Sequence, residues 1–168
     1  KIRNFADRSR NNFSFNVHTI LAGSKIVIAT SETQLKSRVV TVVVGLENYR
    51  NTGRNNIVPV HFAKNDANAF SNFISTTFID HEPEMHLLTD ENATYATIRD
   101  QIRSCVWHLS DKDLFIFFYA GHGFHDAQCN RITAWDTNID NLQTTTISLN
   151  EDIVDVVSKS QCQKALIF

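Results

Sequence analysis

The sequence predicts an α/β fold in which a mostly parallel sheet is covered by helices on both faces, as a three-layer sandwich. Apolar runs rich in valine and aromatic residues occupy residues 39–46, 114–120 and 164–168, as expected for strands buried on both faces. Segments with apolar residues at helical spacing separate these runs. Strands that alternate with helices in this way form parallel sheets through right-handed crossovers.

The first 38 residues differ in composition from the rest of the chain. They begin polar and basic, which is typical of a linker or an arm. Two β-rich segments, residues 13–22 and 25–30, are separated by a Gly-Ser pair and indicate a possible β-hairpin. We therefore expect an N-terminal arm or linker at residues 1–38 and a folded domain at residues 39–168.

The spacing of apolar residues predicts the helices and strands of the first half of the domain. After the first strand, residues 48–59 form a long polar loop, and the next helix has one apolar face, formed by Ala63, Ala67, Phe70 and Ile74. Residues 85–88 predict a short second strand. Residues 94–109 predict a second helix, whose apolar side holds Ile98, Ile102, Cys105 or Val106, and Leu109.

The second half of the domain starts with the central strand, residues 114–120. A long loop with a small strand near residues 132–135 follows it. The Ser-Leu-Asn-Glu sequence at residues 148–151 is a capping box that opens a third helix, with Ile153, Val156 and Val157 facing inward. Residues 164–168 then start a fourth buried strand.

Composition limits the classes of function. With 42% hydrophobic and 20% charged residues, the 168-residue chain resembles a soluble globular protein. Its 16 basic and 18 acidic residues nearly balance, so nucleic acid and membrane surfaces are not expected partners. Three cysteines argue against a disulfide framework and favour a reducing, cytoplasmic location. The chain starts at Lys1 and stops inside an apolar run, so we expect further domains in the same polypeptide.

A Gly-His-Gly turn, residues 121–123, ends the central strand. Its glycines permit a sharp exit of the chain and close approach of the backbone. Ligands and chemistry collect at the carboxyl ends of strands in parallel α/β sheets, where a histidine can act as acid or base or activate a nucleophile. A lone histidine could also simply cap a strand end, but this setting makes His122 the leading catalytic candidate.

No cysteine of the chain is an evident nucleophile for His122. Cys162 precedes its strand and so falls near the opposite edge of the sheet, and Cys105 lies on an apolar helix face, as core cysteines do. We expect Cys129 to be a surface residue on a mobile loop. The alternative is a metal-dependent hydrolase using His122, His125 and Cys129, but no fourth ligand is evident, so we assign no metal.

Four segments carry a pattern in common with a known family: residues 42–49, 62–70, 87–94 and 113–123, the last with Tyr-Ala-Gly-His-Gly. Together, in this order and spacing, they resemble the caspase-like cysteine peptidases, and more closely the metacaspase and bacterial branch than true caspases. The resemblance spans about residues 39–168. It implies the caspase–hemoglobinase fold and a cysteine-type endopeptidase that cleaves protein or peptide substrates with a Cys–His dyad.

The resemblance also implies roles for individual residues. His122 would pair with a cysteine that follows the next core strand, and the family places that cysteine about 50 residues after the histidine. The nucleophile would then fall just beyond Phe168, and the chain alone would be inactive. Gly123 would offer a backbone N–H to the oxyanion, although turn geometry explains this glycine equally well. A catalytically inactive caspase-like scaffold or interaction module is the alternative function.

The resemblance also implies a specificity: in metacaspase-like enzymes the aspartate of the Asn-Asp-Ala sequence lines the pocket for a substrate Arg or Lys, and here that residue would be Asp66. An acid favoured by the helix dipole is its other interpretation. Ala120 stands where many relatives have serine, which removes a hydroxyl from the pocket. Glu47 and Tyr49 either border the cleft or are solvated. A further option is that Lys64, with His61, accommodates an acidic side chain.

The remaining acids suggest no clear metal site. Asp136 resembles the aspartate that the family has after its histidine, and we expect it to organise a loop. The resemblance implies no cofactor, although some metacaspases need calcium. The acidic residues after His122 lack the ligand spacing of a calcium loop, so we expect them to be solvated; they are Asp126, Asp140, Glu151, Asp152 and Asp155.

Overall fold

In a computed structural model of the chain, the structure describes residues 37–50, 57–126 and 128–168. The expected hairpin at residues 13–30 lies outside the described residues. No helix in these ranges has the length and apolar character that crossing a membrane requires.

Four parallel strands form the central sheet, in the order β2-β1-β3-β7. They are β1 (Val39–Gly45), β2 (Glu84–Thr89), β3 (Leu114–Ala120) and β7 (Lys164–Ile167). Each of these strands was predicted from its apolar run, but the expectation that residues 164–168 form a buried strand was wrong, because β7 lies at the edge of the sheet and all its residues are exposed. All four carboxyl ends therefore lie at one edge of the sheet, which we call the carboxyl edge.

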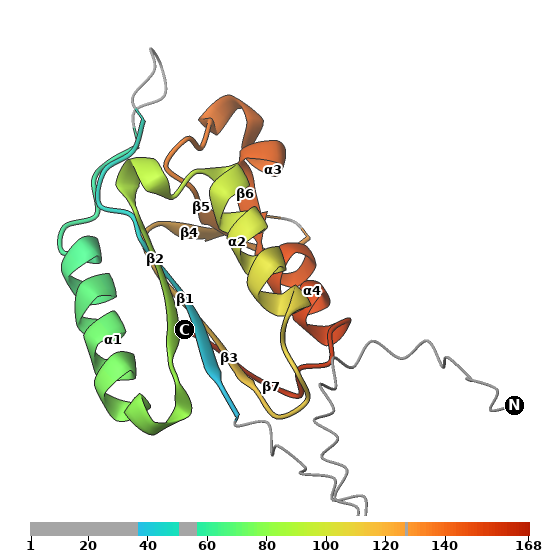
Figure 1. Ribbon diagram of the computed structural model, residues 1–168. Helices are drawn as coiled ribbons and strands as arrows, with labels where there is room; N and C mark the ends of the chain where they lie inside the picture. The colour runs from blue at the N-terminus through green and yellow to red at the C-terminus, as the bar shows by residue number, and fades with distance from the viewer. Residues whose placement is uncertain (1–36, 51–56, 127) are drawn as a thin grey trace, which may run out of the picture. The chain divides into compact units, whose positions relative to one another are not determined.

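Helices cover both faces of this sheet (Figure 1), which confirms the predicted layers. Helix α1 (Ala63–Thr77) lies on one face, and α2 (Tyr95–Trp107) and α4 (Asp155–Ser158) lie on the other. Short turns complete the chain: η1 (Ile79–His81), η2 (Asp90–Asn92), η3 (Ile139–Asn141), α3 (Leu142–Thr145) and η4 (Leu149–Val154).

A second, antiparallel sheet, which the sequence did not predict beyond one small strand, follows β3. It has the order β4-β5-β6 and consists of β4 (Gly123–His125), β5 (Asn130–Thr133) and β6 (Thr146–Ser148). Because β4 starts directly after His122, this sheet fixes the chain on the far side of the histidine.

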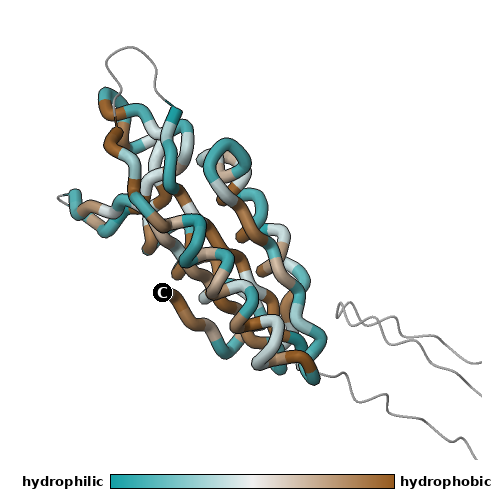
Figure 2. The backbone as a smooth tube through the Cα atoms, turned by 90° about the vertical axis from the view of Figure 1, so that its left-hand side faces the viewer, coloured by the Kyte–Doolittle hydropathy of each residue, from teal (hydrophilic) through white to brown (hydrophobic). Residues whose placement is uncertain are grey.

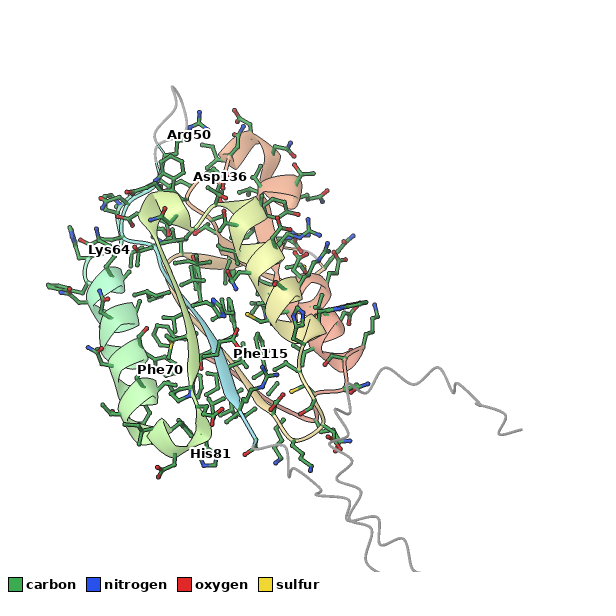
Figure 3. All side chains as sticks on the ribbon, in the orientation of Figure 1. Arg50, Lys64, Phe70, His81, Phe115 and Asp136 are labelled. Atoms are coloured by element: carbon green, nitrogen blue, oxygen red, sulfur yellow. The ribbon has the colours of Figure 1, made fainter. Side chains whose placement is uncertain are left out.

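The alternation of side chains along the strands divides the core into two layers. Val40, Val42 and Val44 of β1 pack in the cluster that contains α2, together with Phe115. Residues of opposite parity pack toward α1, where Phe70 stacks on Phe118 of β3 at 4.3 Å. Figure 2 shows hydrophobic segments in the interior of the domain. In Figure 3, Phe70 and Phe115 lie on opposite sides of the sheet.

The predicted capping box is only half correct. Ser148 does cap the turn that follows, since its Oγ accepts a hydrogen bond from the backbone N–H of Glu151. The reciprocal contact comes from Asp152, not Glu151: its Oδ2 accepts from the N–H of Ser148 at 2.9 Å. The reason is that the segment starts as a wider π-helical turn before α4, which moves the carboxylate that faces the cap by one residue.

Gly45 allows α1 to approach the carboxyl edge of the sheet. A Cβ at this position would lie 2.6 Å from the Cβ of Ala67 and 2.9 Å from the carbonyl oxygen of Ala63. Only glycine fits such a contact without displacing the helix. The first turn of α1, which carries Asp66, is therefore held against the end of β1.

Candidate active site

His122 lies at the carboxyl edge, between the end of β3 and the start of β4. Its ring nitrogen Nε2 is 2.7 Å from the carbonyl oxygen of Val58, in the loop between β1 and α1. A carbonyl only accepts hydrogen bonds, so Nε2 carries the proton in this contact. In the neutral ring, Nδ1 is then left unprotonated and can accept a proton from another group.

Tyr49 holds the backbone of His122. Its side chain is 6% exposed, and its hydroxyl oxygen accepts a hydrogen bond from the His122 N–H at 3.0 Å. The two rings stack with centroids 5.6 Å apart and an angle of 29° between their planes. The Thr133 hydroxyl, on β5, donates to the same oxygen at 3.0 Å. The sequence left the role of Tyr49 open, and the structure places it in contact with the candidate catalytic residue.

Tyr119 binds the other side of the same turn. Its hydroxyl lies 2.9 Å from the His122 carbonyl oxygen and 2.9 Å from Oγ1 of Thr133. Burial, followed by the nearby Tyr49, raises the pKa of Tyr119 well above its usual value, so the phenol stays protonated and can donate. A Cβ on Gly121 would lie 2.4 Å from this hydroxyl, which explains the glycine before His122.

Asp90, directly after β2, fixes the loop that carries Tyr49. Its carboxylate accepts hydrogen bonds from the N–H groups of Glu47 and Asn48, both at 2.9 Å, and from the Asn48 side chain at 3.1 Å. It also pairs with Lys64 at 2.9 Å. Burial opposes ionisation, but the hydrogen bonds from Asn48 and Lys64 outweigh it and lower the pKa of Asp90 below its ordinary value.

Asp136 organises the neighbouring loops, in agreement with the role predicted for it. Its Oδ1 accepts from the backbone N–H of Tyr95, the first residue of α2, at 2.7 Å. The preceding residue, Trp135, accepts from the N–H of Arg50 and donates to the carbonyl of Ala93, at 2.8 and 2.9 Å. Figure 3 shows Arg50 and Asp136 at this end of the domain.

The residues predicted to bind substrate lie at the same edge. Asp66 is exposed in the first turn of α1, and no hydrogen bond to its carboxylate is made by the described residues. Glu47 and Ala120 are half-buried. The carbonyl of Ala120 accepts from the N–H of Leu46 at 2.8 Å, which ties the ends of β3 and β1 together. The pocket role of these residues stays a prediction.

Gly123 is exposed and starts β4, opposite Ile132 of β5. The neighbouring pair, His122 and Thr133, is joined by a ladder hydrogen bond from the Thr133 N–H to the His122 carbonyl at 3.0 Å. Hydrogen-bonded and non-hydrogen-bonded pairs alternate along an antiparallel ladder, so Gly123 is in a non-hydrogen-bonded pair. Its N–H consequently points away from β5, and its role toward an oxyanion stays a prediction.

Among the described residues, the hydrogen bonds of the three cysteines all go to groups other than His122. The expectation that Cys129 is a surface residue was wrong: it is 9% exposed and its Sγ lies against the Ser148 hydroxyl, because the antiparallel sheet folds over it. Cys162 contacts the carbonyl of Asp113, at the amino end of β3, as predicted. Cys105 is buried on α2, and burial raises the pKa of its thiol.

The alternative metal cluster of His122, His125 and Cys129 is not assembled. His125 is hydrogen-bonded to Asn130 at 3.0 Å and His122 to Val58. Among the described residues, the groups close enough to share an ion are instead Glu84, His86 and Cys105, which the sequence did not single out.

Two of the acids considered for calcium are engaged within the protein. Asp126 accepts from the N–H groups of Cys129 and Gln128 and pairs with Arg131; these contacts hold the pKa of its carboxyl well below the usual range. Asp152 pairs with Arg99 at 2.8 Å. Asp126 and Asp152 are therefore structural residues, whereas we expected them to be solvated.

The geometry defines an α/β domain whose candidate site, centred on a histidine, lies at the carboxyl edge of a parallel sheet. The family model described as "Caspase domain" matches residues 38–167. The chain therefore belongs to the caspase-domain family of cysteine peptidases, peptidase C14, and the resemblance seen in its sequence is confirmed.

A solved structure shows the same fold. The crystal structure of protein GSU0716 from Geobacter sulfurreducens superposes with a TM-score of 0.59 at 14% sequence identity. The match covers 77% of this chain and 48% of that one, so the present chain spans less than half the length of this neighbour. Comparison with curated proteins gives no significant match.

Proposed function

We propose that this domain is the histidine-bearing part of a cysteine endopeptidase of the metacaspase or bacterial caspase-like branch, which cleaves proteins after Arg or Lys. One observation carries the proposal: the His122 Nε2–H is bound to the Val58 carbonyl at 2.7 Å. This contact fixes the ring's tautomer and leaves Nδ1 as the base.

The catalytic cycle follows from this arrangement. A cysteine thiol gives its proton to Nδ1 of His122, and the imidazolium that forms keeps its Nε2–H on the Val58 carbonyl. The thiolate attacks the scissile carbonyl carbon, and the Gly123 N–H binds the resulting oxyanion. His122 then protonates the leaving amine, and water hydrolyses the thioester with His122 again as base, which restores the thiol.

The thiol must come from a segment that reaches His122. The last residue of the chain, Phe168, continues β7 beside β3: its carbonyl accepts from the Tyr119 N–H at 3.1 Å. A residue that follows Phe168 would therefore emerge at the carboxyl edge, next to the Gly-His-Gly turn. This position supports a nucleophile supplied after residue 168 of a longer polypeptide.

Cleavage after a basic residue is supported by the charges around α1. The exposed Asp66 offers a carboxylate at the carboxyl edge. Lys64, the other candidate for binding a substrate side chain, is already paired with Asp90, and that contact raises its pKa. The three free cysteines, Cys105, Cys129 and Cys162, are consistent with a reducing, cytoplasmic location, which we also propose.

Peptidase activity of a polypeptide that continues this sequence past residue 168 tests the proposal. Fluorogenic peptides with Arg, Lys or Asp before the scissile bond are compared, with and without calcium. We expect cleavage after Arg and Lys, loss of cleavage in His122→Ala, and unchanged cleavage in His125→Ala. His125 is the matched control because it lies three residues further on β4 and is bound to Asn130.

Substitution of Asp66 tests the specificity separately. Asp66→Asn removes the negative charge and is expected to raise KM for Arg peptides by about tenfold or more, since a charge-assisted hydrogen bond contributes about 1.5–3 kcal/mol. Cleavage after Asp alone would keep the peptidase and refute the role of Asp66. No cleavage under any of these conditions would instead support a catalytically inactive interaction module.

A further inference from the structure

A second group of reactive side chains lies away from His122, between the start of β2 and the last turns of α2. It consists of Glu84 and His86, two residues apart on the same face of β2, and Cys105 on α2. One carboxylate oxygen, one imidazole nitrogen and one thiol sulfur lie within 4.8 Å of one another. The caspase-domain assignment gives this group no role.

The three groups border an open cavity of about 200 Å³. Cys105 is 5% exposed, whereas His86 is half-buried and Glu84 exposed, so the group has a buried sulfur and an accessible side. His86 Nε2 already lies 2.8 Å from Glu84 Oε1. An ion can reach the group from solvent, and there is room for a water molecule beside it.

Neighbouring side chains orient two of the three groups. The Gln101 amide, one turn earlier on α2, donates to the Cys105 sulfur at 3.3 Å. Arg38 lies 3.7 Å from the outer oxygen of Glu84, Oε2, which leaves Oε1 directed at His86. The charge of Arg38 is itself largely engaged by Asp113 at 2.9 Å. Donors placed behind the ligating atoms in this way are a regular feature of protein metal sites.

We propose that Glu84, His86 and Cys105 bind one Zn²⁺ ion, with a water molecule in the fourth position. Zinc prefers this set of oxygen, nitrogen and sulfur donors, and it takes three protein ligands and an open position where a site faces solvent. Magnesium and calcium would require oxygen donors in place of the thiol and the imidazole. On binding, the Cys105 thiol releases its proton to solvent and His86 binds as the neutral ring.

The zinc site is separate from the candidate active site and does not depend on the proposed peptidase function. Glu84 pairs with Val40 near the start of β1, whereas His122 follows the other end of β3. The ion would join the edge strand β2 to α2. We therefore expect zinc to stabilise the domain by mass action, because the unfolded chain does not hold the three ligands together.

The test is metal binding by the purified chain. ZnCl₂ is titrated in competition with a chromophoric chelator, and CoCl₂ serves as a spectroscopic probe. We expect one Zn²⁺ per chain, a rise in Tm with zinc, and a sulfur-to-cobalt charge-transfer band that disappears in Cys105→Ser. His86→Gln, at a half-buried position, and Glu84→Gln, at an exposed one, weaken zinc binding more than Gln101→Ala does. Loss of the Gln101 amide weakens it by about tenfold.

Matched controls separate this site from adventitious binding. His108→Gln changes a histidine that lines the same cavity but lies outside the ligand group, and Cys162→Ser removes a thiol elsewhere. Neither is expected to change the zinc affinity. Zinc binding that survives Cys105→Ser and His86→Gln in folded protein, or a cobalt complex without the charge-transfer band, would overturn the assignment.

Discussion

Replacement of Tyr49 by phenylalanine removes one oxygen atom and tests how His122 is held. That oxygen accepts from the His122 N–H and from the Thr133 hydroxyl. The hydroxyl can turn to the His122 carbonyl, 3.1 Å away, but the N–H has no second acceptor among the described residues. A buried donor without a partner costs about 1–3 kcal/mol. We therefore expect Tyr49→Phe to lower the free energy of unfolding by about 2 kcal/mol.

Tyr119→Phe is the matched control, since it removes an identical hydroxyl from the same network. Tyr119 donates to the His122 carbonyl, which also accepts from the Thr133 N–H. Its loss leaves no N–H unpaired, so we expect a cost of about 1 kcal/mol or less. In urea the two variants should differ clearly, because 2 kcal/mol shifts the midpoint by about 1 M when m is about 2 kcal/mol/M.

Amide hydrogen exchange gives the residue-specific readout. The His122 amide is expected to be protected in the wild-type chain and in Tyr119→Phe. In Tyr49→Phe it should exchange faster, and the loss of protection should correspond to about the same free energy as the loss of stability. If the amide keeps its protection in Tyr49→Phe, or if Tyr119→Phe is the more destabilised variant, the hydroxyl of Tyr49 does not anchor the histidine as argued.

Three further predictions concern the stability of the domain. Gly45→Ala places a methyl group 2.6 Å from Ala67 and is expected to cost about 1–3 kcal/mol in thermal or urea unfolding. Asp90→Ala leaves two backbone N–H groups unpaired and should be less stable than Asp90→Asn, whose oxygen can still accept and which tolerates the positive φ of 41°. The pKa values of Asp90 and Asp113 are lowered in the folded state. The stability that these two carboxylates contribute is therefore complete above about pH 4, near the pKa of the unfolded chain, and is lost as the pH falls through their folded pKa values. Urea midpoints measured from pH 6 to pH 2 should decline in that window, and they should decline less steeply in Asp113→Asn.

The sequence predicts the sheet well because its inner strands, β1 and β3, are largely buried and so form unbroken apolar runs. Residues 114–120 are the clearest example, and the position of His122 at the end of β3 follows from that run and the two glycines. The helix at residues 94–109 was also predictable, since Thr94 caps its first turn and Ile98 and Ile102 face the core.

Contacts between distant parts of the chain could not be predicted in the same way. Tyr49 and His122 are 73 residues apart, and no local pattern specifies that one binds the other. The Val58 carbonyl is a backbone group, so residue identity gives no signal for it. Cys129 was misjudged because the short strands β4, β5 and β6, which bury it, contain too few residues for a clear alternation.

Many of the hydrogen bonds that hold the carboxyl edge together involve backbone groups of its loops. Asp90 accepts from the N–H groups of Glu47 and Asn48, at the start of the loop that follows β1 (the β1 loop). The same loop brings the Tyr49 hydroxyl to the His122 N–H. Trp135 joins the β1 loop to the loop after β2 through its own N–H and carbonyl.

Other side chains complete this connection: Asn48 and Lys64 bind Asp90, Thr133 donates to the Tyr49 hydroxyl, and Tyr119 and Thr133 contact the His122 carbonyl. Asp90 and Tyr49 are the two that link the loop after β1 to the histidine backbone. Substitutions at Asp90 and Tyr49 should therefore displace the histidine while leaving its own side chain unchanged, and they separate positioning from chemistry.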